Sequence, residues 1–186
     1  MSTPTPTTIV PFGAYVAVDT QTLIWGGLRK GIPGLPPCKA EDADKEKRAH
    51  LLLFDLDEAK AKLVVPSVVV TELLLPINEQ FHGSFVAVMS QRFHCPPYDL
   101  PSAALAARLW QFGHSLPPEE QNTRTALKAD IQIIASAKVH GARFFYTDDW
   151  KCRKLAEKAG LVARSLPTHS LNLFAGPDAE GQPILP

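Results

Sequence analysis

The feature that most constrains this chain is the alternation of short apolar runs with longer amphipathic segments. The apolar runs are rich in β-branched and aromatic residues and are too short to be typical helices. We predict strands at 14–18, 63–65, 143–146 and 161–164. Strands with no polar alternation are buried on both faces, which is typical of parallel sheets covered by helices. The sequence therefore predicts an α/β fold with a central, mainly parallel sheet.

The amphipathic segments place apolar residues at helical spacing, with charged residues between them. Helices are predicted at 20–25, 42–62, from 67 onward, 78–91, 102–112, 123–139 and 150–159. Ser67 and Ser102 are the expected N-caps of their helices, and Gly141 is the expected residue after a helix end. Residues 29–38 are rich in proline and glycine and are predicted to form a loop.

The length of 186 residues suits one domain. We predict a flexible N-terminal lead at 1–11, a domain at 12–166 and a loose C-terminal tail at 167–186. Basic and acidic residues number 19 each, so the formal net charge is zero. A nucleic-acid-binding function would therefore need a local basic surface rather than an overall basic chain.

The cysteines Cys38, Cys95 and Cys152 are far apart and odd in number, with no CxxC pair. This argues against a zinc site or a disulfide framework and favours a reducing compartment. The N-terminal segment lacks the pattern of a signal peptide. No apolar run approaches the roughly 18–20 residues that span a bilayer. We therefore expect a cytoplasmic protein with no membrane partner.

Acidic residues recur where predicted strands end or helices begin. Asp19 follows the first strand directly, and Asp148 and Asp149 follow the strand that ends at residue 146. Glu72 lies in a strongly aliphatic segment, where an unpaired carboxylate would be costly, and Asp130 precedes a long apolar helix face. Taken one at a time, these residues can be helix caps, exposed positions or partners of a helix dipole.

Together, the same carboxylates predict a cation site. Sites in parallel sheets form at the carboxyl ends of the strands. Carboxylates gathered there would repel one another without a counter-ion, and Mg²⁺ prefers oxygen ligands of this kind.

Four segments in this order resemble the PIN-domain nucleases, which include the VapC-type toxins: 16–20, 65–73, 130–137 and 145–149. The first is a strand with its leading Asp19, and the second carries an S-x-x-x-x-E pattern that ends at Glu72. The third begins at Asp130, and the fourth is a T-x-D pattern that ends at Asp149. The resemblance spans about residues 14–166.

The resemblance implies a PIN-like three-layer α/β/α sandwich that hydrolyses RNA phosphodiester bonds with Mg²⁺ or Mn²⁺. The catalytic and metal-binding residues would be Asp19, Glu72, Asp130 and Asp149, with one or two ions. Asp148 is left open as an alternative inner ligand. Water would attack phosphorus in line, and no protein nucleophile is needed.

Further roles follow from the same resemblance. Thr147 and Ser67 would support the site, although an N-cap role alone also explains Ser67. Arg124, Lys128 and Lys151 are candidates for binding substrate phosphate, and solvated helix starts are the alternative. The implied partners are RNA, an antitoxin protein and a second copy of the chain in a homodimer.

Other functions are kept as alternatives. A catalytically inactive PIN-like module would bind RNA or protein without cleaving it, and a DNA or flap-type nuclease could share the fold. The segment 54–58 imitates the D-x-D opening of dehalogenase-type phosphatases, but it lies in a predicted helix rather than after a strand. No HExxH, GxGxxG or GxSxG pattern occurs in the sequence.

Overall fold

The computed structural model describes residues 10–117 and 123–168. At its centre lies a sheet with strand order β2-β1-β3-β4, in which every pair of neighbours is parallel. The strands are β1 (Tyr15–Val18), β2 (Lys62–Val64), β3 (Phe144–Tyr146) and β4 (Val162–Arg164). The predicted parallel sheet is confirmed, and each strand lies within a residue or two of its expected place.

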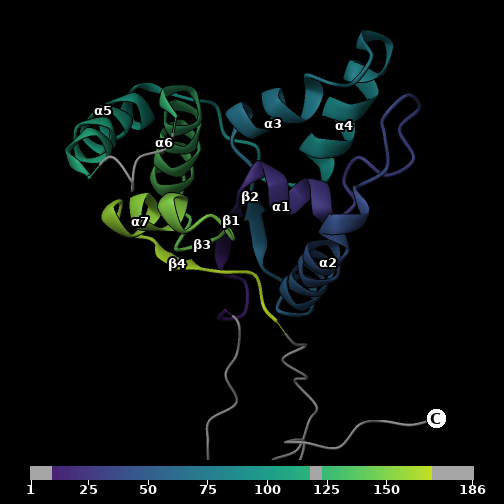
Figure 1. The fold of residues 1–186 in the computed structure, drawn as a ribbon, viewed down its shortest axis with the longest axis horizontal. Coiled ribbons are helices and arrows are strands. Elements are labelled where there is room, and N and C mark those ends of the chain that lie inside the picture. Colours follow the sequence, from purple (N-terminus) through teal and green to yellow (C-terminus); the bar gives the residue numbers. More distant parts are fainter. Residues whose placement is uncertain (1–9, 118–122, 169–186) are drawn as a thin grey trace, which may run out of the picture.

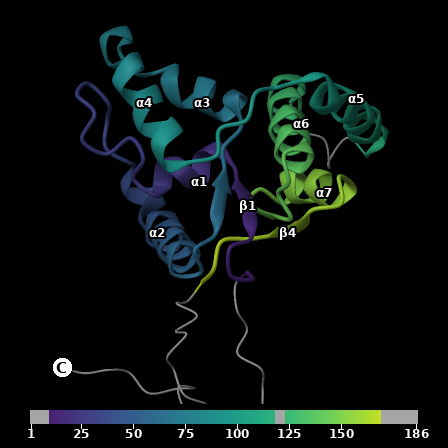
Figure 2. The same cartoon turned by 180° about the vertical axis from the view of Figure 1, so that it is seen from behind.

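Helices cover both faces of this sheet. They are α1 (Thr20–Trp25), α2 (Ala43–Glu58), α3 (Ser67–Leu74), α4 (His82–Arg92), α5 (Leu100–Ser115), α6 (Arg124–Val139) and α7 (Trp150–Lys158). Short 3₁₀ turns precede α2 and α4 at Ala40–Asp42 and Glu79–Phe81. Figure 1 shows α1 to α4 on one side of the strands and α5 to α7 on the other, and Figure 2 shows the same from behind. The predicted three-layer α/β/α arrangement is confirmed.

The connections create a crevice beside β1. The chain passes from β1 to β2 on one side, and then crosses through α3, α4, α5 and α6 to reach β3 on the other side. The direction of winding therefore changes between β1 and β3, and ligands of such sheets bind at this point. Val18 pairs with Tyr146, and the amide of Asp19 donates to the Tyr146 carbonyl at 3.2 Å. The residues that follow the two strands thus begin side by side.

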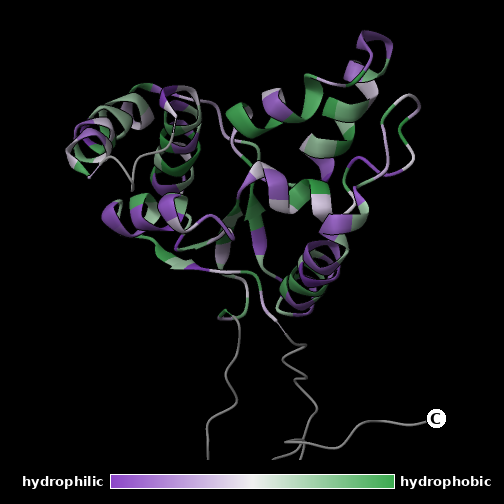
Figure 3. Ribbon diagram, viewed as in Figure 1, coloured by the Kyte–Doolittle hydropathy of each residue, from purple (hydrophilic) through white to green (hydrophobic). Residues whose placement is uncertain are grey.

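The core joins the three layers. Leu52 and Leu56 of α2 pack from one side, and Ile134 of α6 and Leu155 of α7 pack from the other, all fully buried. Phe145 of β3 is equally buried in the sheet between them. Figure 3 shows the resulting mixture of hydrophobic and hydrophilic positions along α2. Each such buried side chain stabilises the fold by roughly 1.5–3 kcal/mol, which holds the strand ends in place.

Two predicted helix caps are wrong. The N-cap of α3 is Pro66, and Ser67 instead accepts a hydrogen bond from the Tyr98 amide at 3.2 Å. The N-cap of α5 is Asp99, which accepts from the Ser102 amide at 2.9 Å and from its hydroxyl at 2.6 Å. An aspartate three residues before Ser102 takes the cap first, since the carboxylate accepts both donors. Gly141, with φ of +93°, follows the end of α6 as predicted.

Both ends of the described chain pack against the core. Val10, placed in the predicted flexible lead, is only 1% exposed, and Leu166, the last residue of the predicted domain, is equally buried. The remainder of the lead and tail, at 1–9 and 169–186, lies outside the described residues. Residues 29–38 form turns without a helix or strand, as predicted. Within the parts of the chain that the structure describes, no helix is both long and apolar enough to cross a membrane.

Candidate functional site

A pocket of about 550 Å³ opens at the carboxyl ends of β1 and β3. Its walls come from α1, α3, α6, the loop after β3 and the loop after α1. It is lined by Asp19, Thr20, Gln21, Ile24, Trp25, Arg29, Glu72, Leu75, Asp130, Ile133, Asp149 and Cys152. The structure therefore brings four of the predicted site carboxylates, from four different segments, to the wall of one pocket. We call it the acidic pocket.

Asp19 leaves β1 and caps α1. Its Oδ1 accepts from the Thr22 amide at 2.7 Å, and its Oδ2 accepts from the Thr147 hydroxyl. Burial raises the pKa of the Asp19 carboxyl, the hydrogen bonds from Thr147 and Thr22 oppose that rise, and the charge of Asp148 adds to it. Asp19 therefore both caps α1 and lines the acidic pocket.

Thr147 links the ends of the two central strands. Its side chain is fully buried, and its hydroxyl donates to Asp19 while accepting from the Asp149 amide at 3.1 Å. Asp149 in turn caps α7, since its Oδ1 accepts from the amides of Lys151 at 2.8 Å and Cys152 at 3.3 Å. The hydroxyl therefore sets the relative position of two pocket carboxylates.

Glu72 reaches the acidic pocket from α3. Its Oε2 accepts from the Thr20 hydroxyl, and its backbone carbonyl accepts from Arg29 Nη2 at 2.7 Å. Arg29 Nε also donates to the Leu73 carbonyl at 3.2 Å. Burial lowers the pKa of Arg29, and the nearby Glu72 charge works in the opposite direction. Thr20 and Arg29 were not predicted as site residues.

The two missed residues differ in how they could have been found. Thr20 directly follows Asp19 in the first segment that carries the family resemblance, so its position was a usable signal. Arg29 lies in a glycine- and proline-rich loop with no periodicity, and its partners are backbone carbonyls more than forty residues away. No local pattern could have identified it.

Three of the pocket carboxylates lie near the thiol of Cys152, which also lines the acidic pocket. Its thiol is buried, and burial raises its pKa well above the usual value, with further increases from Asp130, Asp19 and Asp149. These three acidic groups, one on α6 and two at the N-caps of α1 and α7, therefore lie around the Cys152 thiol. Asp130 itself is half-buried on α6.

The donor set suits a hard cation, because carboxylate oxygens are the ligands that Mg²⁺ and Mn²⁺ prefer. The described side chains do not yet form a coordination sphere: no three His, Cys, Asp or Glu groups among residues 10–117 and 123–168 lie close enough to hold an ion. Asp19, Glu72 and Asp149 instead accept hydrogen bonds from neighbouring donors. The pocket therefore has carboxylates suited to a hard cation, but in the described residues they are not grouped around a common point.

Comparisons with known proteins bear on the fold. No protein-family model and no curated protein sequence matches this chain. Among solved structures, a chain of the VapBC2 complex from Rickettsia felis, bound to a DNA fragment from their promoter, is similar, with a TM-score of 0.53 and 11% sequence identity. The likeness covers 81% of this chain and 98% of that chain. The chain has a PIN-like α/β/α fold. At this low identity the likeness concerns the fold alone.

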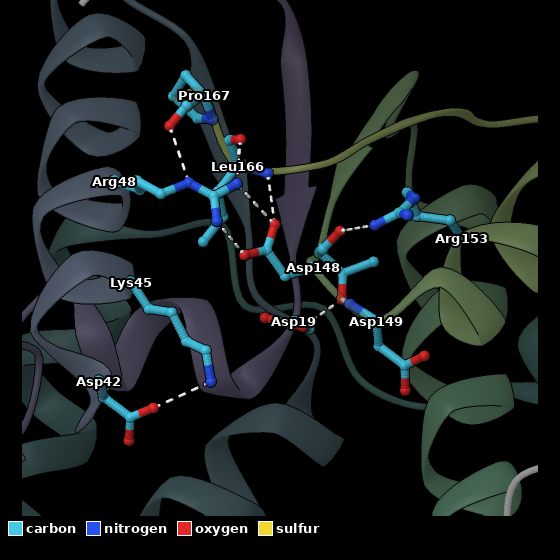
Figure 4. A network of polar contacts seen from close by, with 10 residues as sticks. Asp19, Asp42, Lys45, Arg48, Asp148, Asp149, Arg153, Leu166 and Pro167 are labelled. Atoms are coloured by element: carbon cyan, nitrogen blue, oxygen red, sulfur yellow. Dashed lines mark hydrogen bonds and ion pairs between the residues drawn. The ribbon is translucent and has the colours of Figure 1, made fainter. Parts of the chain in front are cut away.

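The PIN-like fold separates the two adjacent aspartates after β3. Asp149 lines the acidic pocket, whereas Asp148 turns toward α2, as Figure 4 shows. Asp148 accepts from Arg48 through both carboxylate oxygens and from the Leu166 amide at 3.0 Å. This geometry does not support the alternative in which Asp148 is the inner metal ligand.

The remaining predicted site residues lie away from the wall of the acidic pocket. Ser67 bonds to the Tyr98 amide, as described above. The Arg124 guanidinium stands 5.9 Å from the centre of the Trp110 ring, and Lys128 is exposed on α6. Lys151 Nζ lies 5.7 Å from the Trp150 ring, next to Asp149. The basic residues are on the surface of the PIN-like fold, and their binding of phosphate stays a prediction.

Proposed function

We propose that this protein is a Mg²⁺- or Mn²⁺-dependent endoribonuclease. The observation that carries the proposal is the convergence of Asp19, Glu72, Asp130 and Asp149 on one pocket at the carboxyl ends of β1 and β3. Their segments are far apart in the sequence, so their meeting is a property of the fold. A cluster of carboxylates with little structural need for one another is a candidate catalytic site.

In this proposal the four carboxylates would hold the cation. When bound, such an ion lowers the pKa of water and offsets the charge of a phosphodiester. Thr147 and Thr20 would act as positioning residues, because their hydroxyls orient the Asp19 and Glu72 carboxylates. Arg29 is the basic residue that lines the same pocket, and it offers a positive charge to substrate phosphate.

We further propose that the chain is the toxin of a toxin–antitoxin pair and forms a homodimer. The toxin role is supported by the similarity to a chain of the VapBC2 complex, of which 98% is covered. The homodimer follows only from the resemblance in the sequence. RNA is the proposed substrate because of the motif resemblance in the sequence. An antitoxin partner would regulate access to the acidic pocket.

One observation favours a second candidate function, a PIN-like module without catalysis. No three potential ligands lie within coordination reach of a common point in the described residues, and neighbouring hydroxyls or amides already bind Asp19, Glu72 and Asp149. A protein of this kind would bind RNA or a partner protein but hydrolyse neither.

Mn²⁺ titration by calorimetry separates the two candidates. A nuclease should bind Mn²⁺, and Asp19→Asn and Asp130→Asn should each weaken binding and abolish cleavage of a labelled single-stranded RNA. A matched surface variant, Asp57→Asn in α2, should bind and cleave as the wild type does. An inactive module would show no Mn²⁺ binding. Preference for single-stranded or flap DNA over RNA would instead identify a DNA nuclease.

A further inference from the structure

A second pocket adjoins the acidic pocket. It has a volume of about 720 Å³ and is formed where the loop after α1, residues 26–39, folds beside α1 and the start of α2. Figure 1 shows this loop between α1 and α2. Gln21, Ile24, Trp25 and Arg29 line both pockets, so these four residues form a shared wall. We call the second cavity the loop pocket.

The walls of the loop pocket combine an apolar part with charged groups. Ile32 and Leu35 from the loop and Ile24 and Trp25 from α1 form the apolar part. The charged residues of the lining are Arg29, Lys30, Lys39, Asp42 and Glu46. Pockets of roughly 300–1,000 Å³ that combine apolar walls with polar groups are typical sites for small molecules. The loop that builds this cavity is the proline- and glycine-rich segment, in which the proposed chemistry gives a role to Arg29 alone.

Trp25 adds an unmet hydrogen bond to the shared wall. It is only 8% exposed, and its Nε1–H has no acceptor among the described residues. A buried donor without a partner is costly, so a ligand that brings an acceptor to this wall would gain from it.

Arg29 stands at the junction of the two pockets in a fixed orientation. Its Nε and Nη2 donate to the carbonyls of Leu73 and Glu72, at 3.2 Å and 2.7 Å. No hydrogen bond from its Nη1 is found within residues 10–117 and 123–168. A guanidinium keeps its charge and carries five N–H donors, so Nη1 is available to an anion at the shared wall. Phosphate is the anion that the proposed function would bring there.

We infer that the loop pocket binds one base of the substrate strand, with the phosphate of the same nucleotide held by Arg29 beside the acidic pocket. This inference rests on the proposed function, because it takes the strand from the nuclease site. Apolar walls would contact the faces of the base, and Gln21 and His50 would meet its polar edges. The loop pocket would thus decide which nucleotide is accepted next to the cleaved bond.

Cys38 provides a direct test, because it is exposed and lines the loop pocket. A hydrogen bond with Glu46 raises the pKa of its thiol to about 11, so alkylation should be slow and should speed up at alkaline pH. Each of the four nucleoside 5′-monophosphates is added to the metal-free protein, and alkylation is followed by mass spectrometry. At least one nucleotide should slow alkylation of Cys38 about 5-fold or more, while half-buried Cys95 in the same molecules should react unchanged.

Arg29→Ala separates the contributions of base and phosphate. It should weaken protection by the nucleotide about 10-fold and leave protection by the corresponding nucleoside unchanged. Arg108→Ala, which removes an exposed arginine of α5 that lines neither pocket, is the matched control and should not alter either. Leu35→Arg, at a half-buried loop position that packs against the core, should abolish protection by filling the cavity, and circular dichroism should show that the variant remains folded.

Cleavage and Cys38 protection, measured on the same proteins, tell a wrong base-binding inference from a wrong nuclease function. Asp130→Asn should lose cleavage yet keep Cys38 protection, because Asp130 lines only the acidic pocket. If no nucleotide protects Cys38 while RNA is cleaved, the base-binding role is wrong and the nuclease stands. Protection by a partner protein but by no nucleotide would also overturn the inference. If a nucleotide protects Cys38 but the protein neither cleaves RNA nor binds Mn²⁺, the base-binding inference holds and the proposed nuclease function is wrong.

Discussion

Arg48 holds Asp148 through two parallel hydrogen bonds, Nη1 to Oδ2 at 2.7 Å and Nη2 to Oδ1 at 3.1 Å. The same guanidinium donates to the carbonyls of Leu166 at 2.6 Å and Pro167 at 3.2 Å (Figure 4). One side chain of α2 thereby joins the loop after β3 to the segment after β4. That loop also carries Thr147 and Asp149, so the arginine fixes one edge of the acidic pocket.

Replacing Arg48 should therefore destabilise the fold. Arg48→Ala is expected to lower the free energy of unfolding by about 1–3 kcal/mol, since it leaves a largely buried carboxylate and two carbonyls without their donors. Arg48→Lys should recover only part of this, because an ammonium cannot reproduce the planar fork. Urea unfolding monitored by circular dichroism measures both.

Lys45→Ala is the matched control, since Lys45 also lies on α2 and makes one contact to a carboxylate, Asp42 at 3.0 Å, from a side chain that is itself 43% exposed. Exposed pairs contribute about 0–1 kcal/mol, so this change should be small. Equal losses for the Arg48 and Lys45 variants would show that the Asp148 contacts contribute little.

Thr147→Val should disturb the acidic pocket from within. It removes the hydroxyl that joins Asp19 to the Asp149 amide, and about 1–3 kcal/mol of stability should be lost because both partners remain without it. Amide hydrogen exchange at Asp149 should accelerate. Thr147→Ser keeps the hydroxyl and should preserve slow exchange, at a cost of about 1 kcal/mol for the missing methyl group. Unchanged exchange in the valine variant would contradict the proposed link.

The sequence predicted the fold well because its signals are local. Apolar runs such as 14–18 and 143–146 can only be buried strands, and helices of regular periodicity lie between them. Asp19 and Asp149 could be predicted for the same reason, since each lies between a buried strand and the helix that it caps. What failed were local choices between similar residues, as at Asp99 and Ser102, where two good capping residues compete.

The parts of the site that could not be predicted depend on tertiary contacts. The T-x-D spacing favours Asp149 but leaves Asp148 open, and the sequence does not show that Arg48, a hundred residues away, binds Asp148. Arg29 enters the site only because the loop after α1 folds back to the end of α3. Such pairings leave no periodicity or spacing in a single sequence.

Asp149→Asn and Asp148→Asn should have opposite effects. Asparagine is as good an N-cap as aspartate, so Asp149→Asn should keep α7 capped and change stability by no more than about 1 kcal/mol. It should nevertheless weaken Mn²⁺ binding about 10–100-fold, a loss of the size that follows from disturbing a metal site. Asp148→Asn should lose stability with its Arg48 pair and keep Mn²⁺ affinity within a few-fold. Calorimetry and urea unfolding on both proteins test this, and the reverse pattern would assign the inner position to Asp148.

The stability of the metal-free protein should depend on the ionisation of Asp19. Burial raises the pKa of this carboxyl in the folded state above its unfolded value of about 3.9. The folded protein therefore binds the proton more tightly than the unfolded chain. The resulting stabilisation is complete below the unfolded pKa and is lost as pH rises through the raised pKa of the folded state. Above that pH the buried charge is a constant cost.

Asp19→Asn isolates this effect, because asparagine keeps an acceptor for the Thr22 amide but cannot ionise. The difference in unfolding free energy, variant minus wild type, should grow as pH rises from about 4 and then level off. Urea unfolding in chelator across this range gives the difference directly. Mn²⁺ should then stabilise the wild type at neutral pH, where Asp19 is ionised, and stabilise the variant much less. A difference that is flat with pH would mean that the Asp19 carboxyl ionises without cost, and equal stabilisation of both proteins by Mn²⁺ would exclude Asp19 as a ligand.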